Sequence, residues 1–182
     1  MNLVLIGYRG TGKSTVGALL AERLGMRYVC MDNEITKRAK MSTPEIVAQF
    51  GWKKFRDMES ELTKELTAQD GLVIDTGGGV IERQENVDEL RANTQVFWLH
   101  ASVGTITSRI KGDSSRPALV AGKTFVEEIA EVLERREPIY RVAAHHKVDT
   151  NDTTPSQIAD SIIEVWIQRP QQALTARGDT YK

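Results

Sequence analysis

Short apolar runs alternate with helical hydrophobic patterns along the chain. Between the runs, apolar residues recur every three or four positions, Gly25 ends the first such helix, and Ser42 and Glu45 form a capping box for a later one. Strands that alternate with helices join as parallel neighbours, with helices on both faces of the sheet. The pattern predicts an α/β fold of three layers, α/β/α, around a central five-stranded parallel sheet that binds ligands at the carboxyl ends of its strands. The five predicted strands are residues 3–6, 28–31, 72–74, 96–99 and 147–149.

The first apolar run leads directly into a glycine-rich turn, residues 7–14, with the sequence GYRGTGKS. This G-x-x-x-x-G-K-S pattern lies between a predicted strand and a predicted helix, as in phosphate-binding loops. Backbone N–H groups and the helix N-terminus can surround a phosphate, Lys13 adds a full charge, and the Ser14 hydroxyl can reach Mg²⁺. The chain is therefore predicted to bind a nucleoside triphosphate, rather than to carry a chance glycine-rich turn. The predicted ATP-binding residues of the loop are Gly7, Gly10, Thr11, Gly12, Lys13, Ser14 and Thr15.

Two charged residues lie on the apolar face of the helix predicted from Trp52 onward. Glu59 is seven residues from both Trp52 and Leu66, so it shares their side of the helix, and Arg56 lies three residues before it. A buried charge needs a partner. One interpretation is a mutual Arg56–Glu59 pair at the edge of the apolar face. The other is that the pair lines a polar pocket and binds an anionic substrate.

The helix predicted around residues 129–133 shows the same anomaly. Arg136 is seven residues after Ile129 and three after Leu133, so it lies on their face. A planar guanidinium can bind a carboxylate through two parallel hydrogen bonds. If the bound nucleoside triphosphate donates a phosphoryl group, two inward arginines favour a small acid as the acceptor of that group. The alternative is that Arg136 extends to solvent at the helix end.

Three consecutive glycines, Gly77, Gly78 and Gly79, follow the strand predicted at residues 72–74. Glycine has no Cβ, so the backbone there can approach a ligand closely. The carboxyl end of a parallel strand is also where α/β proteins bind ligands. The sequence predicts that these glycines line the acceptor site, with a flexible turn as the alternative.

Composition limits the possible partners. Lys and Arg number 24 and Asp and Glu 25, so the formal net charge is -1, which does not favour binding to nucleic acid or to a membrane surface. No apolar stretch reaches transmembrane length. The single cysteine, Cys30, excludes an intrachain disulfide and favours a reducing compartment. We expect a cytoplasmic protein without nucleic-acid or membrane partners, most simply a monomer.

The length of 182 residues suits a single domain, which we expect to span residues 1–168. Within it, residues 111–123 are polar and aperiodic and include Arg116. A mobile loop of this kind can close over ATP as a lid and stabilise charge on the transferring phosphate; the alternative is a solvated surface loop. Residues 169–182 have no apolar period and are predicted to form a disordered C-terminal tail.

Taken in order, these features resemble the shikimate kinase family. The resemblance extends from Asn2 to about Ile167, and the joint pattern is more specific than any single piece. It implies a P-loop kinase fold with a mobile lid, and transfer of the γ-phosphate of ATP to the 3-hydroxyl of shikimate with Mg²⁺ as cofactor. The matching pieces are the phosphate-binding loop, an aspartate after the second strand, Phe55-Arg56-x-x-Glu59, Gly77-Gly78-Gly79, Arg116-Pro117 and Arg136-x-Pro138-Ile139-Tyr140.

The resemblance also implies roles for individual residues. Asp32 matches the aspartate that contacts the shikimate hydroxyls and is placed to act as base, and Arg56 and Arg136 match the arginines that bind the carboxylate. The implied catalytic residues are Lys13, Asp32 and Arg116. The implied ATP contacts beyond the loop are Arg109, Arg116 and Pro155. The implied substrate-binding residues are Asp32, Arg56, Glu59, Gly77, Gly78, Gly79 and Arg136.

One position departs from the family pattern. The family usually has Asp-x-Asp after the second strand, and here Cys30 replaces the first aspartate, which normally helps to hold the Mg²⁺ hydration shell. A thiol is a poor partner for a hard, oxygen-seeking ion. Asp75 stands where the family more often has a small residue. Our hypothesis is that Asp75 supports Mg²⁺ through water, with Ser14 as the direct protein ligand; the alternative is that Asp75 only caps the glycine turn.

Two other functions remain open on the sequence alone. Another small-molecule P-loop kinase, such as a gluconate kinase, would share the fold and the loop. A regulatory nucleotide-binding relative would keep them without transferring phosphate, and Cys30 is the feature that favours it. A GTPase is disfavoured because the sequence contains no Asn-Lys-x-Asp motif for reading guanine.

Overall fold

A computed structural model describes residues 1–110 and 125–168 of the chain. Its centre is a five-stranded sheet with the strand order β2-β3-β1-β4-β5, and every neighbouring pair is parallel. The predicted parallel sheet of five strands is thereby confirmed. The strands are β1 (Asn2–Ile6), β2 (Arg27–Cys30), β3 (Leu72–Asp75), β4 (Thr94–His100) and β5 (His146–Asp149).

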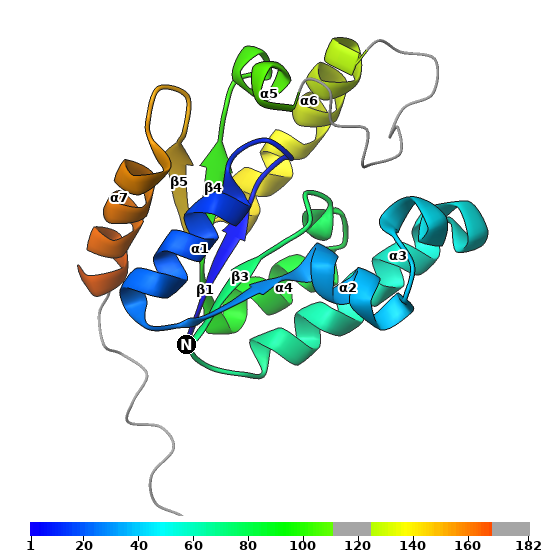
Figure 1. Ribbon diagram of the computed structural model, residues 1–182, viewed down its shortest axis with the longest axis horizontal. Coiled ribbons are helices and arrows are strands. Elements are labelled where there is room, and N and C mark those ends of the chain that lie inside the picture. Colours follow the sequence, from blue (N-terminus) through cyan, green and yellow to red (C-terminus); the bar gives the residue numbers. More distant parts are fainter. Residues whose placement is uncertain (111–124, 169–182) are drawn as a thin grey trace, which may run out of the picture.

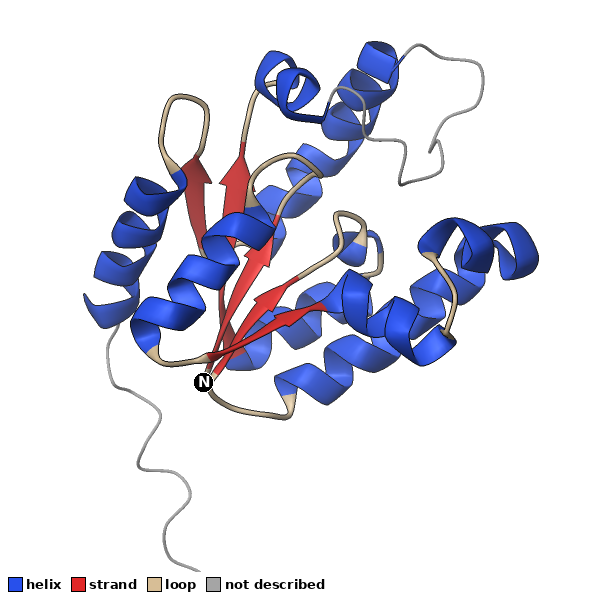
Figure 2. Cartoon of the chain, viewed as in Figure 1, coloured by secondary structure: helices blue, strands red, loops and turns tan. Residues whose placement is uncertain are grey.

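Helices cover both faces of the sheet (Figure 1, Figure 2). One face carries α1 (Lys13–Leu24) and α7 (Pro155–Gln168). The other carries α3 (Thr43–Thr67), α4 (Gln84–Asn93) and α6 (Phe125–Ala143). This arrangement confirms the three-layer α/β/α architecture. The remaining elements are α2 (Met31–Ala39), α5 (Val103–Ile110) and the single-turn 3₁₀ helix η1 (Val80–Glu82).

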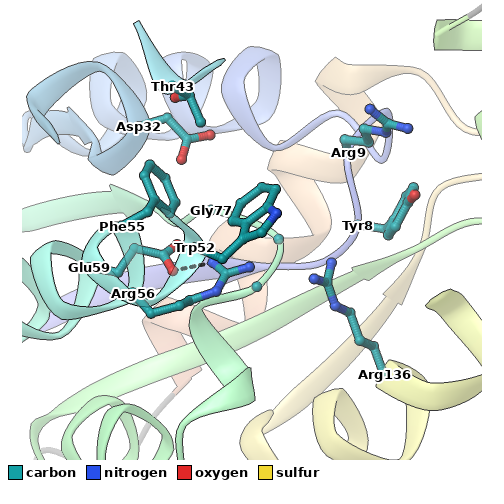
Figure 3. A pocket seen from close by; sticks show the side chains of 12 residues that line it. Tyr8, Arg9, Asp32, Thr43, Trp52, Phe55, Arg56, Glu59, Gly77 and Arg136 are labelled. Carbon is teal, nitrogen blue, oxygen red and sulfur yellow. Dashed lines mark hydrogen bonds and ion pairs between the residues drawn. The ribbon is translucent and has the colours of Figure 1, made fainter. Parts of the chain in front are cut away.

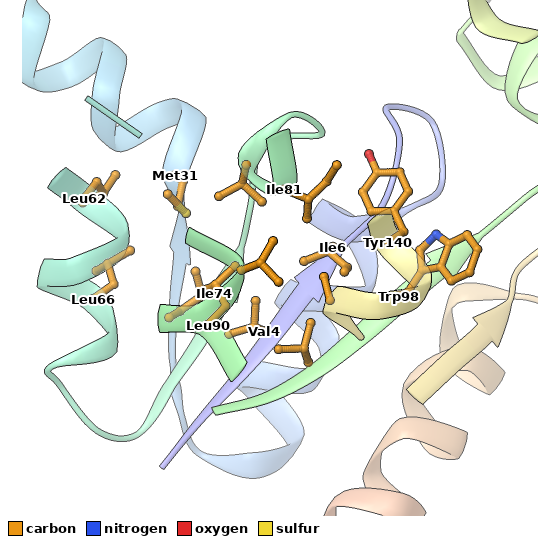
Figure 4. Packing of buried hydrophobic residues seen from close by; sticks show 14 of the residues in the cluster. Val4, Ile6, Met31, Leu62, Leu66, Ile74, Ile81, Leu90, Trp98 and Tyr140 are labelled. Atoms are coloured by element: carbon orange, nitrogen blue, oxygen red, sulfur yellow. The ribbon is translucent and has the colours of Figure 1, made fainter. Parts of the chain in front are cut away.

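The central strand β1 explains why its sequence is continuously apolar. Leu3 and Leu5 belong to the hydrophobic cluster beneath α1 and α7, whereas Val4 and Ile6 belong to the cluster beneath the opposite helices. Successive side chains of a strand point to opposite faces, so a strand covered on both sides needs apolar residues throughout. Figure 4 shows Val4 and Ile6 packed in the second of these clusters, near Ile74.

Three local features refine the sequence prediction. β2 ends at Cys30, one residue before the predicted end, because Met31 already begins α2. The helix predicted from Trp52 is the second part of α3, which starts after its capping box and is interrupted at Gly51, where φ is 79° and ψ is 166°. Between residues 80 and 93, for which the apolar pattern makes no prediction, the chain forms η1 and α4.

Two predicted segments, the lid at residues 111–123 with Arg116 and the tail at residues 169–182, lie outside the described residues. Within residues 1–110 and 125–168, no helix combines the length and the apolar character needed to cross a bilayer.

Candidate active site

The loop between β1 and α1 surrounds the N-terminus of α1. Gly10 and Gly12 have φ values of 80° and 94°, which other residues rarely adopt, so this path of the loop depends on glycine. The ammonium of Lys13 donates to the carbonyls of Gly7 at 2.9 Å and Tyr8 at 3.1 Å. Its charge therefore lies within the loop, close to the helix N-terminus where backbone N–H groups attract a phosphate.

Arg109, in the last turn of α5, links this loop to the end of β5. Its guanidinium donates to the carbonyl of Gly10 at 3.3 Å and to the hydroxyl of Thr150 at 3.2 Å. It also donates to the carbonyls of Thr150 and Asn151. Pro155 begins α7 four residues after Asn151. Of the ATP contacts implied beyond the loop, Arg109 is thus joined directly to the loop, and Pro155 lies shortly after the segment that Arg109 contacts.

Asp75 ends β3 beside the phosphate-binding loop. One carboxylate oxygen, Oδ2, accepts hydrogen bonds from the hydroxyls of Ser14 at 2.7 Å and Tyr28 at 2.9 Å. Cys30 is the neighbour of Asp75 across the β2–β3 register. Burial raises the pKa of the Cys30 thiol, which favours its neutral form. The carboxylate beside Ser14 therefore comes from β3, one strand away from the position that Cys30 occupies.

A pocket opens beside the loop, where the strands end (Figure 3). It brings together all seven residues predicted to bind the acceptor, from α2, α3, α6 and the glycine run. The resemblance to a known family implied this group, but spacing alone could not, because the residues are spread over about a hundred positions of the sequence. The described residues that line the pocket are Tyr8, Arg9, Asp32, Thr43, Trp52, Phe55, Arg56, Glu59, Gly77, Gly78, Gly79 and Arg136.

Arg56 and Glu59 form an ion pair on α3, and both line this pocket, so the two interpretations of the pair are compatible. The Arg56 guanidinium lies 5.3 Å from the centre of the Trp52 ring. The side chain of Glu59 is 1% exposed, and its Oε1 meets no hydrogen-bond donor among the described residues. Burial raises the pKa of Glu59, and the nearby charge of Asp32 acts in the same direction, whereas Arg56 opposes them. A buried oxygen of this kind can accept a hydrogen bond from a substrate hydroxyl.

Arg136 is only 3% exposed and does not extend to solvent. Its Nε and Nη2 donate to Oε1 of Glu82 at 2.9 and 2.8 Å. The second oxygen of Glu82, Oε2, lies 3.3 Å from Nη2 of Arg56. Glu82 thus stands between the two pocket arginines. No pattern in the sequence indicates this residue, because η1 is too short to show a periodic pattern.

The glycine run leaves room for these charged side chains. A Cβ on Gly79 would overlap the Arg56 guanidinium. A Cβ on Gly77 would lie 2.6 Å from Oε1 of Glu59 and 2.9 Å from Oδ1 of Asp32, closer than real Cβ atoms approach. Gly77 and Gly79 therefore leave the space that these charged side chains occupy, and a larger residue at either position would force the side chains to move.

Gly78 is held by α6. The Tyr140 hydroxyl donates to the Gly78 carbonyl, and its ring stacks on Trp98 with 5.7 Å between ring centres. Tyr140 lies one helical turn after Arg136. The same face of α6 therefore supplies Arg136 to the pocket and the Tyr140 hydroxyl that binds the Gly78 carbonyl.

Other lining residues were also missed or assigned differently from the sequence. Trp52, which belongs to the apolar face of its predicted helix, is half-buried and also lines the pocket. Tyr8, Arg9 and Thr43 carried no signal that separated them from ordinary loop and helix-end residues. Arg116, the remaining predicted catalytic residue, lies outside the described residues.

Comparison with known proteins decides the family. A family model described as shikimate kinase matches residues 9–167 of the chain. The chain belongs to the shikimate kinase family. The shikimate kinase of Thermodesulfovibrio yellowstonii is 41% identical over 163 residues, which cover 90% of this chain and 93% of that protein.

Solved structures of shikimate kinases agree with this assignment. The enzyme from Acinetobacter baumannii in complex with shikimate superposes with a TM-score of 0.87 at 32% identity, over 91% of this chain and 92% of that one. The enzyme from Aquifex aeolicus superposes with a TM-score of 0.80 at 30% identity, over 92% of this chain and 96% of that one. The predicted family and the P-loop kinase fold are thereby confirmed, whereas the roles of individual residues stay predictions.

Proposed function

We propose that this member of the shikimate kinase family transfers the γ-phosphate of ATP to the 3-hydroxyl of shikimate. The observation that carries the proposal is the convergence of Asp32, Arg56 and Arg136 in one pocket beside the phosphate-binding loop. A pair of guanidinium groups facing a carboxylate suits an acceptor with an acid group and a reactive hydroxyl. The shikimate complex of the related Acinetobacter enzyme supports the same acceptor.

Transfer of a phosphoryl group depends mainly on positioning and on stabilising charge. Lys13 and the N-terminus of α1 would bear the charge of the phosphates. Asp32 lies in the first turn of α2, where the helix dipole favours a carboxylate, and it lines the acceptor pocket. It would orient the acceptor hydroxyl and take its proton. Glu59 would accept a hydrogen bond from another hydroxyl of the acceptor through Oε1.

Truncation of Arg136 tests the carboxylate-binding role. We expect Arg136→Ala to raise the KM for shikimate by roughly 10- to 150-fold, since each charge-assisted hydrogen bond lost costs about 1.5–3 kcal/mol. The KM for ATP should stay unchanged, because the pocket lies on the acceptor side of the loop. Steady-state kinetics with each substrate varied in turn would measure both values.

Arg141→Ala is the matched control, because Arg141 is another arginine of α6 and its side chain is exposed to solvent. It should leave both KM values close to those of the unmodified protein. An equal rise in both KM values for Arg136→Ala would contradict the assigned role and indicate a disturbed fold.

The donors at the end of β3 fit Mg²⁺, the cofactor that the family implies. The Ser14 hydroxyl and the Asp75 carboxylate supply oxygen, which this hard ion prefers, next to the phosphate-binding loop. Among the described residues, no three acidic, histidine or cysteine side chains are gathered around a common point, so the phosphates and water would complete the shell. When bound, Mg²⁺ neutralises charge on the transferring phosphate. We propose that Ser14 is its protein ligand. We also propose that Asp75 holds the hydration shell, the role of the family's first aspartate, which Cys30 replaces in this chain.

We expect Asp75→Asn to raise the Mg²⁺ concentration for half-maximal activity by about 10-fold or more, a typical effect of losing an outer-shell carboxylate. Titration of Mg²⁺ at a fixed, saturating ATP concentration would measure it. Tyr28→Phe is the matched control, because it removes the other hydrogen bond to Asp75 and keeps the carboxylate. An unchanged Mg²⁺ requirement in Asp75→Asn would contradict the role of Asp75 in holding the hydration shell. Asp75 would then act only as the cap of the glycine turn.

The proposed reaction is tested by ADP release with Mg²⁺ and ATP in the presence of shikimate, of gluconate or of no acceptor. ADP release that depends on shikimate, with the phosphorylated product identified by mass, would support the proposal. Turnover with gluconate instead would identify another small-molecule kinase. ATP binding without transfer to any acceptor would identify a regulatory relative. We further propose that the protein acts in the cytoplasm as a monomer, in keeping with its composition.

A further inference from the structure

Glu82 lies where three arginines meet. Its Oε1 accepts hydrogen bonds from Nε and Nη2 of Arg136 at 2.9 and 2.8 Å and lies 3.2 Å from Nη2 of Arg135. Its Oε2 lies 3.3 Å from Nη2 of Arg56. The side chain is 28% exposed, compared with 3% for Arg136 and 13% for Arg56. One glutamate thus joins the two arginines of the acceptor pocket, which come from α3 and α6.

The position of Glu82 relative to the pocket distinguishes it from Glu59. Glu59 lines the pocket, whereas the described residues that line it do not include Glu82. Its contacts use the Nε edge of Arg136 and leave Nη1 on the side of Gly78, where a Cβ would be 3.6 Å away. Figure 3 shows the guanidinium ends of Arg56 and Arg136 directed toward the same region of the pocket. Glu82 therefore holds these arginines from outside the space that the acceptor would fill.

Two guanidinium groups that bind one carboxylate must stand close together, and their like charges repel each other most strongly where water is scarce. A carboxylate behind them removes much of this repulsion and fixes their direction through charge-assisted hydrogen bonds. Burial acts to raise the pKa of Glu82, but Arg136, Arg56 and Arg135 hold it below its ordinary value. Glu82 therefore carries its charge at neutral pH.

We propose that Glu82 is a positioning residue for the acceptor's carboxylate. It acts through Arg136 and Arg56, which it holds together as one preorganised anion site, with Nη1 of Arg136 turned toward the pocket. The inference rests on the proposed function, because it assumes that these arginines bind the acid group of the acceptor. It assigns to η1, directly after the glycine run, a part in recognising the acceptor.

A different role for the same contacts is competition. If Glu82 occupied the arginines in place of the substrate's carboxylate, its removal would strengthen acceptor binding. The location of Glu82 behind the arginines favours positioning, because substrate and Glu82 then contact different edges of the guanidinium of Arg136. The two roles give changes of opposite sign in the KM for the acceptor.

The test is Glu82→Gln, which keeps the size of the side chain and removes its charge. We expect the KM for shikimate to rise about 10-fold, the lower end of the effect of losing a supporting carboxylate, with kcat and the KM for ATP nearly unchanged. Calorimetric titration of the protein with shikimate alone should show the same loss of affinity. The loss should be much smaller for the methyl ester of shikimate, which has no acid group for the arginines to bind.

Two further variants complete the design. Glu85→Gln is the matched control, because Glu85 lies three residues later, pairs with Arg83 at 3.6 Å and is 52% exposed; it should behave as the unmodified protein. Glu82→Asp keeps the charge on a shorter side chain and should fall between Glu82→Gln and the unmodified protein. Thermal unfolding of each variant shows whether the fold is kept, and if Glu82→Gln does not fold, the KM of Glu82→Asp decides.

An unchanged or lower KM for shikimate in folded Glu82→Gln would overturn the inference, as would an equal loss for the ester and the acid. Failure of the proposed function has a different signature, because the unmodified protein itself would then show no ADP release that depends on shikimate.

Discussion

Replacing Asp32 with asparagine is expected to lower kcat by roughly 10²–10⁴-fold, the range over which a positioned general base contributes. Asparagine keeps the shape of the side chain and a hydrogen-bond acceptor, but it cannot take the proton of the acceptor hydroxyl. Asp32 lines the pocket and lies in the first turn of α2, so the substitution removes a charge from the acceptor side and leaves the phosphate-binding loop intact. The affinity for ATP should therefore be retained.

The measurement is kcat with saturating shikimate, together with the dissociation constant of ATP from titration calorimetry. Glu34→Gln is the matched control, because Glu34 lies on the same helix and pairs with Arg38 away from the pocket. Near-normal turnover in Asp32→Asn would contradict the role as base. A similar loss in Glu34→Gln would indicate that α2 tolerates no change of charge, and the loss would then say nothing about proton transfer.

Replacing Lys13 with alanine is expected to lower kcat by roughly 10²–10³-fold, as for removal of one preorganised donor that stabilises transition-state charge. Lys13 is the ammonium that the phosphate-binding loop surrounds, and it donates to the carbonyls of Gly7 and Tyr8. A bound phosphate would meet this charge together with the N–H groups at the start of α1. Acceptor binding should be little affected, because Lys13 is not among the residues that line the acceptor pocket.

The effect of Lys13→Ala is measured as kcat with both substrates saturating. Arg23→Ala is a suitable control, because it removes a positive charge near the other end of α1, where Arg23 pairs with Asp160. Turnover close to that of the unmodified protein in Lys13→Ala would refute the proposed role. A loss of shikimate affinity equal to the loss in kcat would point to a collapsed loop.

Much of the fold could be predicted because its signals are local. The apolar run of β1 is buried on both faces, and the glycine loop follows it directly, so strand, turn and helix could be read in order. The capping box at Ser42 marked the start of α3. Helix α4 carried no clear signal, because its charged and polar residues leave only a short apolar face, with Val87 and Leu90 buried.

The candidate site was predicted where a charge interrupted an apolar face. The structure decides between the interpretations that this spacing left open: Glu59 and Arg136 are nearly inaccessible to solvent, because a helix face that is otherwise apolar is covered by its neighbours. Glu82 does not interrupt an apolar helix face, so no comparable pattern marks it in the sequence. Its contacts with Arg136 and Arg56 join residues that are 54 and 26 positions apart in the sequence, and no periodic pattern within one element reports such a contact.

The sequence by itself determined the class of the protein: a parallel α/β fold with a phosphate-binding loop. These features depend on the spacing of residues that are close together in the sequence. Few folds can bury the apolar faces that this spacing creates. Only the tertiary structure decided that Asp75 meets Ser14 and that Glu82 joins Arg56 to Arg136. Such polar contacts depend on which strand ends and helix faces become neighbours, and that is set by the packing of the whole sheet and its two helical layers.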